Sequence, residues 1–361
     1  MKPLKYKEIM PRVAIEKLKL LSTDDLLDLV GKNLESIRCA LFETSYRENL
    51  LKISPNEADS ISMEEALLEN YAQTLNNLIK YSVGNIKNVL LAVVGKFETF
   101  NVKALLRAAK AQMDIDETIK HIIPIGSLTE DQYRDILSSS PTVESVIETI
   151  ASSEFDPIIK EVMVHSKVID GNLLPLELAL DKAVYGNIFE SIKNLKGLDK
   201  LIAKNVLGID ADAINIKMIL RCKAGSIHKD QIKKYFLPSF VFNDEILQNA
   251  LELPDTKSIA EYLLETTDAI INPFYNDMFS QIIERCKSSL SELEAILERA
   301  SLNTSLNIIK KYLKYYNIGF ILAFLNLKWF EIRNLRCIIV GSERKITPEQ
   351  IRRYIVLQNN P

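Results

Sequence analysis

The sequence predicts an all-α protein on three observations. Apolar residues recur at helical spacing, for example at Leu290, Leu293, Ile296 and Leu297. No segment sustains the alternation of apolar and polar residues that is typical of a half-buried strand. Only 11 glycines and 12 prolines occur among the 361 residues, about half the average share, so little material is available for tight turns. We therefore expect long helices with short connections.

Two helix starts are marked by capping sequences. Residues 347–350 read Thr-Pro-Glu-Gln, which supplies a capping hydroxyl, a first-turn proline, an acid at the positive end of the helix, and a glutamine that can bond back to the cap. Residues 129–132 read Thr-Glu-Asp-Gln and carry the same hydroxyl and glutamine. We expect a helix to begin at each of them.

Charge and hydropathy exclude several classes of protein. The 45 basic and 48 acidic residues give a net charge of -3 and are mixed along the chain, which is unlike a nucleic-acid-binding surface or an acidic tail. The longest apolar runs, such as 89–94 and 318–325, are far shorter than the roughly 18 residues that span a bilayer. Residues 1–20 alternate charged and apolar side chains, unlike a signal peptide. We expect a cytoplasmic chain that does not cross a membrane.

The chain contains three copies of one segment. Residues 101–107 (NVKALLR) match 215–221 (NIKMILR). A third copy begins at Glu331 and continues to 350–354 (QIRRY), which matches 231–235 (QIKKY). The copies start 114 and 116 residues apart, a period too long for a solenoid repeat. The pattern is typical of a triplicated helical domain.

The third copy ends before its second half. Residues 21–26 resemble the opening of that half in the first copy, at 128–131. We therefore expect the N-terminal segment to complete the third unit, so that three units close into a ring. The predicted units are 84–170, 171–300, and 301–361 together with 1–83.

Three segments carry a resemblance to a known family. Residues 319–336 read as an apolar helix that runs into Glu-Ile-Arg-Asn-Leu, residues 174–181 with Tyr185 form a second segment, and 215–221 form a third. In this combination the chain resembles the central-stalk C subunits of archaeal-type (A/V-type) rotary ATP synthases, whose vacuolar counterpart is the d subunit. The resemblance covers residues 6–354.

The sequence departs from the family pattern at two places. The family's usual Lys-Glu pair before the Glu-x-Arg-Asn stretch is interrupted by Trp329 and Phe330. In the third copy, Cys337 stands at the offset that holds Arg107 and Arg221 in the first two. These departures concern single contacts.

The resemblance implies both a fold and a role. The fold is a funnel-shaped cup of three helical domains related by a pseudo-threefold axis. The cup sits on the membrane ring of proteolipid subunits and receives the central axle, which is made of subunits of the D and F types. Catalysis in that family belongs to other subunits, so the implied role is torque transmission for ion translocation by a peripheral subunit on the cytoplasmic face. The alternative is a helical scaffold that binds a soluble partner in a concave groove.

The repeated basic positions are the candidate partner interface. They are Lys103, Arg107, Lys217, Arg221, Arg333 and Arg336. In one interpretation they pair with carboxylates of neighbouring helices, while Asn101, Asn215 and Asn334 cap or turn the chain. In the other they line the mouth or base of the funnel and bind axle or ring loops. Glu177 and Asp181 lie four residues apart on one helical face, which favours an ion-paired surface over an acid/base pair.

No motif for catalysis, nucleotide binding or metal binding is legible. Ten residues separate Gly84 from Gly95, too many for a phosphate loop, and Phe97 stands where that loop needs Ser or Thr. The histidines and cysteines are isolated, so we expect surface or capping histidines and buried free thiols. These residues are His121, His165, His228, Cys39, Cys222, Cys286 and Cys337. We expect no catalytic residue, cofactor, metal or directly bound nucleotide.

Overall fold

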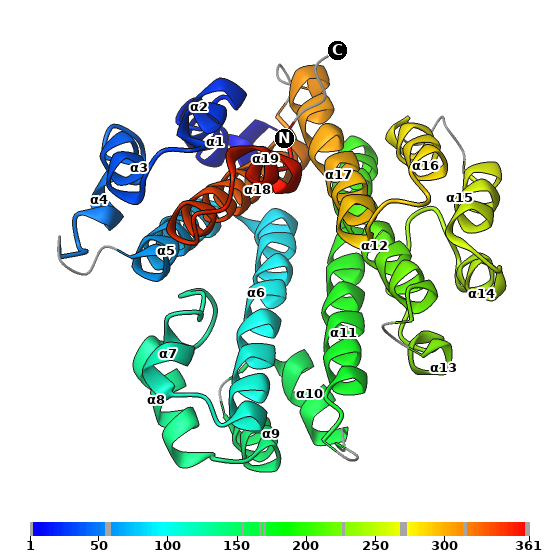
Figure 1. Ribbon diagram of the computed structural model, residues 1–361, viewed down its shortest axis with the longest axis horizontal. Helices are drawn as coiled ribbons and strands as arrows, with labels where there is room; N and C mark the ends of the chain where they lie inside the picture. The colour runs from blue at the N-terminus through cyan, green and yellow to red at the C-terminus, as the bar shows by residue number, and fades with distance from the viewer. Residues whose placement is uncertain are drawn as a thin grey trace. The chain divides into compact units, whose positions relative to one another are not determined.

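A computed structural model describes residues 3–54, 59–153, 155–165, 168, 171–225, 228–267, 273–312 and 316–357. Within these ranges every regular element is a helix and no strand occurs, which confirms the predicted all-α class (Figure 1). No described helix combines the length and the hydropathy that a bilayer crossing requires. The helices fall into two compact units, Leu41–Ser191 and Met1–Ala40 with Ile192–Pro361.

The unit Leu41–Ser191 is built around the long helix α6. Helix α9 packs against both α6 and α10, and α7 packs against α8. Helix α5 buries Met63, Leu67, Tyr71, Leu75 and Leu78 along one face, at the spacing that the sequence pattern predicts. The helices are α4 (Arg47–Leu50), α5 (Ser60–Lys80), α6 (Gly84–Ala111), α7 (Ile115–Ile119), α8 (Glu130–Ser139), α9 (Val143–Ser152), α10 (Pro157–His165) and α11 (Leu174–Lys193), which continues past the unit boundary.

The second unit has a core of three long helices, α12, α17 and α18, each of which packs against the other two. Helix α18 is buried almost all round, which explains its apolar sequence. The helices that follow α12 form a layer in which α15 and α16 pack together (Figure 1). The helices are α12 (Gly197–Lys223), α13 (Lys229–Ile232), α14 (Asp244–Glu252), α15 (Thr256–Glu265), α16 (Phe274–Glu284), α17 (Leu290–Tyr312), α18 (Ile318–Glu343) and α19 (Pro348–Tyr354).

The N-terminal segment belongs to this second unit. It contains the 3-10 helix η1 (Pro3–Tyr6) and helices α1 (Ile9–Leu18) and α2 (Thr23–Leu29), while α3 (Leu34–Leu41) reaches the unit boundary. Helices α1 and α2 pack against α18. The hydroxyl of Ser342 donates a hydrogen bond to the carbonyl of Lys32 at 2.9 Å. Residues 3–40 therefore lie beside the C-terminal helices, whereas the predicted boundaries of the three units stay a prediction.

The two predicted helix starts are confirmed. Thr347 caps α19, with Pro348 in the first turn, and its hydroxyl accepts the Gln350 N–H while the Gln350 side chain bonds back to the cap. Thr129 and Gln132 form the same reciprocal pair at α8. The capping sequences alone were sufficient to place both helices.

The prediction that the cysteines are buried is wrong. All four are free thiols, but Cys39 is exposed and Cys222, Cys286 and Cys337 are half-buried. On α3 the inward face is set by Ile37 and Leu41, which are both buried. Cys39 lies two residues from each of them, on the opposite side of the helix.

Close packing between α12 and α18 depends on a glycine. A Cβ added at Gly319 would lie 2.0 Å from Cγ2 of the buried Ile202. We predict that Gly319→Ala lowers the free energy of unfolding by roughly 1–3 kcal/mol because the helices must separate. Urea denaturation of the purified chain measures this change.

Gly186→Ala is the matched control, because an added Cβ on α11 meets nothing within 4 Å. There the helix preference of alanine should raise the free energy of unfolding by about 0.5–1 kcal/mol. Equal effects of the two substitutions would contradict the close approach at Gly319.

Candidate functional site

Three buried asparagines make the same contact in three helices. Asn101 of α6 bonds both backbone groups of Ile123, with its Nδ2 on the carbonyl at 2.8 Å and its Oδ1 on the N–H at 2.9 Å. Asn215 of α12 holds Leu237 in the same way at 3.1 and 2.8 Å. The third contact follows the same pattern. It joins Asn334 of α18 to Val356, with both distances 2.8 Å. Each asparagine clamp spans 22 residues of sequence.

The clamps correct the register of the third copy. Asn334 lies 119 residues after Asn215, whereas the sequence comparison placed Glu331 opposite that residue. The two alignments differ by three residues. Val340, and not Cys337, therefore occupies the position of Arg107 and Arg221. Residues 331–333 (EIR) resemble 215–217 (NIK) in sequence. The equivalent of Asn215 is nevertheless Asn334, because Asn334 makes the clamp contact.

A buried acid precedes each clamp by three residues, and sequence reasoning missed its role. Glu98, Asp212 and Glu331 are at most 4% exposed. Glu98 accepts the N–H of Ser127 at 2.6 Å, and Asp212 accepts the N–H of Val241 at 3.3 Å. Both N–H groups lie two residues before a helix cap. The constant offset of an acid before an asparagine was the signal that could have revealed these residues.

Glu331 makes the equivalent contact with the other end of the chain. Its carboxylate accepts the N–H of Leu21 at 2.5 Å, one residue before Ser22, the cap of α2. It also pairs with Lys328 at 3.1 Å, where both side chains are buried. Burial lowers the pKa of Lys328. The N-terminal segment thus meets the third acid at the place where internal segments meet the first two.

Five of the six predicted basic residues form ion pairs between helices. Lys103 and Arg107 of α6 pair with Asp181 and Glu177 of α11, at 2.5 and 2.7 Å. The Arg107 pair is bidentate, because Nε and Nη2 contact separate carboxylate oxygens. Glu177 and Asp181 therefore form the ion-paired surface that the sequence favoured.

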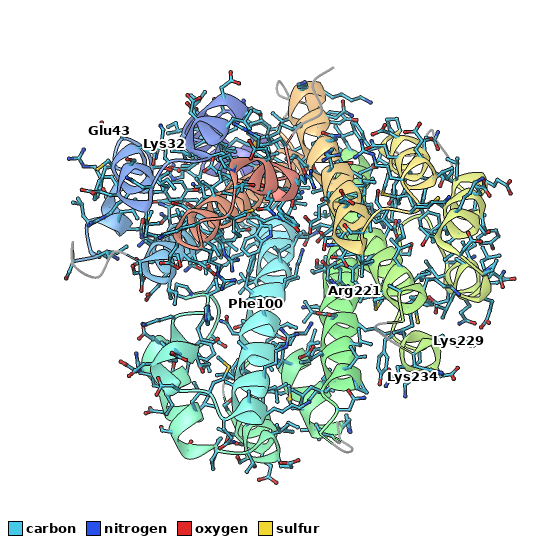
Figure 2. All side chains as sticks on the ribbon, in the orientation of Figure 1. Lys32, Glu43, Phe100, Arg221, Lys229 and Lys234 are labelled. Atoms are coloured by element: carbon cyan, nitrogen blue, oxygen red, sulfur yellow. The ribbon has the colours of Figure 1, made fainter. Side chains whose placement is uncertain are left out.

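The same arrangement recurs between α12 and α17. Lys217 pairs with Glu298 at 2.9 Å, and Arg221 binds Glu294 through two contacts at 2.7 and 3.1 Å. Arg221 lies on the C-terminal part of α12 (Figure 2). Arg333 of α18 reaches Glu298 at 2.5 Å, and Arg336 is half-buried on the same helix. The first interpretation, pairing with neighbouring helices, is confirmed for these five residues, and contact with a partner stays a prediction.

The residues considered for nucleotide and metal binding lie apart. Gly84 begins α6 and Gly95 is inside it, so no loop connects them. The side chain of Lys96 lies over the ring of Tyr185, 5.2 Å from its centroid. His121, His165 and His228 are exposed. Within the described residues, no group of three or more His, Cys, Asp or Glu side chains is arranged to hold a metal ion.

Asp212 should make stability depend on pH. Burial raises its pKa to about 6, against hydrogen bonds from Ser239 and Tyr275 that lower it. Because the folded pKa lies above the unfolded value, the contribution of Asp212 to stability is fully present below about pH 4 and is lost as pH rises through about 6. Relative to Asp212→Asn, the wild type should lose up to roughly 3 kcal/mol of unfolding free energy between pH 4 and 7.

Glu252→Gln provides a control of opposite sign. Hydrogen bonds from Lys229 and Lys233 lower the pKa of this exposed carboxyl to about 2, so its contribution is complete above about pH 4.5 and changes little from pH 5 to 7. Denaturant titrations at a series of pH values compare the three proteins. Parallel curves for the wild type and Asp212→Asn would show that Asp212 has an ordinary pKa.

The comparisons with known proteins identify the family. A family model described as ATP synthase (C/AC39) subunit matches residues 9–354. The C subunit of the A-type ATP synthase of Methanocaldococcus jannaschii is 24% identical over 355 residues, which cover 97% of this chain and 86% of the relative. The corresponding C subunits of Methanosarcina mazei and Methanosphaera stadtmanae are 24% and 28% identical, covering 98% and 79% of this chain and 93% and 72% of theirs. The chain belongs to the ATP synthase (C/AC39) subunit family and is a non-catalytic subunit of a rotary ATPase.

Proposed function

We propose that this chain is the socket that couples the central axle of a rotary ATPase to its membrane proteolipid ring. In this role it binds axle subunits of the D and F types on one side and the ring on the other, on the cytoplasmic face of the membrane. It transmits torque for ion translocation and binds no nucleotide itself. Membership of the family supports the complex, and the repeated asparagine clamp is the observation that supports a rigid coupling element.

Stiffness is the physical requirement for such a socket. An element that sheared under load would dissipate the rotation as internal motion, whereas close-packed helices resist deformation. The clamps and the buried acids Glu98, Asp212 and Glu331 add fixed hydrogen bonds between the interior of those helices and the segments that connect other helices. Because these bonds are shielded from water, breaking one leaves a buried polar group unsatisfied.

The three predicted units remain part of this proposal. Their boundaries are 84–170, 171–300, and 301–361 with 1–83, arranged about a pseudo-threefold axis as a funnel. The identical span of 22 residues within each clamp supports three equivalent units. The bond from the Leu21 N–H to Glu331 supports the closing of the third unit by the N-terminal segment.

The basic residues supply a candidate contact surface for the axle or the ring. The Arg107 and Arg221 side chains remain 59% and 47% exposed although they are paired. Phe100, which is 42% exposed, lies on α6 one turn before Lys103 (Figure 2). Charged side chains next to an exposed aromatic ring are typical of protein interfaces. Each arginine can also replace its contact with Glu177 or Glu294 by a contact with a carboxylate of a partner.

Neutralising whole ion pairs tests this surface without leaving a carboxylate unpaired. We predict that Arg107→Gln with Glu177→Gln, combined with Arg221→Gln and Glu294→Gln, weakens binding of the purified D–F axle complex by about tenfold. The free energy of unfolding should change by less than about 1 kcal/mol for each pair, because exposed ion pairs contribute little. Biolayer interferometry measures the affinity.

Arg134→Gln with Asp116→Asn is the matched control, because this pair joins α8 to α7 on the surface. It should leave axle binding unchanged. Unchanged binding in both sets would mean that the repeated arginines serve the fold alone.

Affinity capture with the tagged chain tests the coupling role against the helical scaffold. Recovery of soluble partners without axle or proteolipid subunits would favour the scaffold.

A further inference from the structure

Each of the first two copies places a tyrosine hydroxyl in its polar cluster, on the clamp asparagine in the first copy and on the preceding acid in the second. Tyr133 is fully buried, and its hydroxyl accepts a hydrogen bond from Nδ2 of Asn101 at 3.0 Å. Tyr275 is also fully buried and donates its hydroxyl to Asp212 at 2.5 Å. Burial raises the pKa of Tyr275, so its phenol stays protonated and able to donate. In both copies a phenol ring fills the space next to the polar cluster.

The two rings come from different helices. Tyr133 is four residues after the helix cap Thr129, and the matching position after Asn243 is Leu247. Tyr275 is two residues after Pro273, and the matching position after Pro157 is Ile159. Each copy therefore combines one tyrosine with one aliphatic residue. The phenol is retained although the position that supplies it changes, which indicates that the cluster requires a phenol.

The third copy has no tyrosine at the first of these positions. The residue four after its cap Ser22 is Leu26. Asn334 is 2% exposed, and among the described residues its Nδ2 donates only to the carbonyl of Val356. Since an amide nitrogen carries two hydrogens, one N–H of Asn334 is left for another acceptor. Asn101 gives the corresponding hydrogen to Tyr133.

A cavity of about 250 Å³ lies at this place in the third copy. Its apolar lining includes Leu21, Leu26, Leu302, Leu327 and Phe330, and its polar lining consists of Lys17, Thr23, Glu331 and Asn334. Leu26, Glu331 and Asn334 are the equivalents of Tyr133, Glu98 and Asn101. The cavity is larger than the roughly 150 Å³ apolar cavity that holds benzene in a model protein, so an aromatic ring fits.

We propose that this cavity binds a phenol, with the ring among the leucines, the hydroxyl oxygen accepting from Nδ2 of Asn334, and the hydroxyl hydrogen donated to Glu331. The ligand supplies the group that the chain itself supplies in the first two copies. This binding site goes beyond the coupling role and does not rest on it. The phenol is either a free small molecule or the tyrosine side chain of another polypeptide.

Titration calorimetry of the intact chain with p-cresol tests the proposal. We expect a dissociation constant on the order of 0.1 mM, and a rise in melting temperature with ligand concentration, because the ligand binds the folded chain. Toluene lacks the hydroxyl and should bind at least about tenfold more weakly, because Nδ2 of Asn334 then gains no acceptor and Glu331 gains no hydrogen bond from the ligand. Equal affinities, or no p-cresol binding up to 10 mM, which is roughly 100 times the expected constant, would overturn the proposal.

Leu26→Tyr should fill the cavity from within and abolish p-cresol binding, whereas Leu51→Tyr, at a position that is 63% exposed, should leave it unchanged. Retained binding in Leu26→Tyr would refute the assigned place. If that variant does not fold, leucine methyl NMR of the wild type decides: p-cresol must shift the signals of Leu26, Leu302 and Leu327 but not that of Leu51.

N-acetyl-tyrosinamide distinguishes the two sources of the phenol. If it binds as well as p-cresol, the cavity accepts a tyrosine of a partner chain. If p-cresol alone binds, the ligand is a free phenol. Axle binding is measured independently, so failure of either proposal leaves the other intact.

Discussion

The structure depends on one recurring interaction, the buried amide that holds both backbone groups of a residue 22 positions further along the chain. In an all-helical protein the connecting segments have no sheet ladder to satisfy their N–H and C=O groups, and a buried segment must find other partners. A carboxamide has one donor and one acceptor at the spacing of a peptide group, so a single asparagine satisfies both. Loss of one clamp would leave two buried backbone groups unsatisfied, each costing about 1–3 kcal/mol.

The buried acids Glu98, Asp212 and Glu331, each three residues before a clamp asparagine, accept a further backbone N–H from a connecting segment. A buried carboxylate is costly unless several donors surround it. Asp212 receives hydrogen bonds from two backbone N–H groups, from Ser239 and from Tyr275. Glu331 is surrounded differently, since Lys328 and the N–H of Leu21 approach it. The third connection is thus completed by the opposite end of the chain, which ties both ends of the sequence to one core helix.

Sequence patterns predicted the elements well because their causes are local. Helical spacing and the capping residues Thr129 and Thr347 act within a few positions, so the all-α class and these helix starts could be read directly. Ion pairing of the repeated basic residues was one of the two interpretations that the sequence allowed. The partners could not be read from the sequence, because Arg107 reaches Glu177 across 70 residues and several acids would have been equally plausible.

The register of the third copy and the exposure of Cys39 were misjudged for a different reason, although the match of 350–354 with 231–235 already has the 119-residue offset of the clamp. Sequence similarity weighs every position equally, whereas in the structure the register is defined by Asn334, which bonds both backbone groups of Val356. Cys39 was assigned to the core from the habits of cysteine, but Ile37 and Leu41 determine which face of α3 turns inward. The long-range contact of Asn334 with Val356 decides the first case, and the inward face of α3 decides the second.

The corrected register also shows where the three copies differ. In the first two copies Arg107 and Arg221, six residues after the clamp asparagine, each bind a carboxylate through two contacts. In the third copy Val340 occupies this position. The third copy also has the cavity beside Asn334 and takes its closing segment from the N-terminus. In the proposed coupling role, a socket with three identical charged positions would bind an asymmetric axle equally well in three orientations. In that proposed role, Val340 in place of a third arginine would remove the degeneracy, because one orientation would then match the charges of the axle better than the other two.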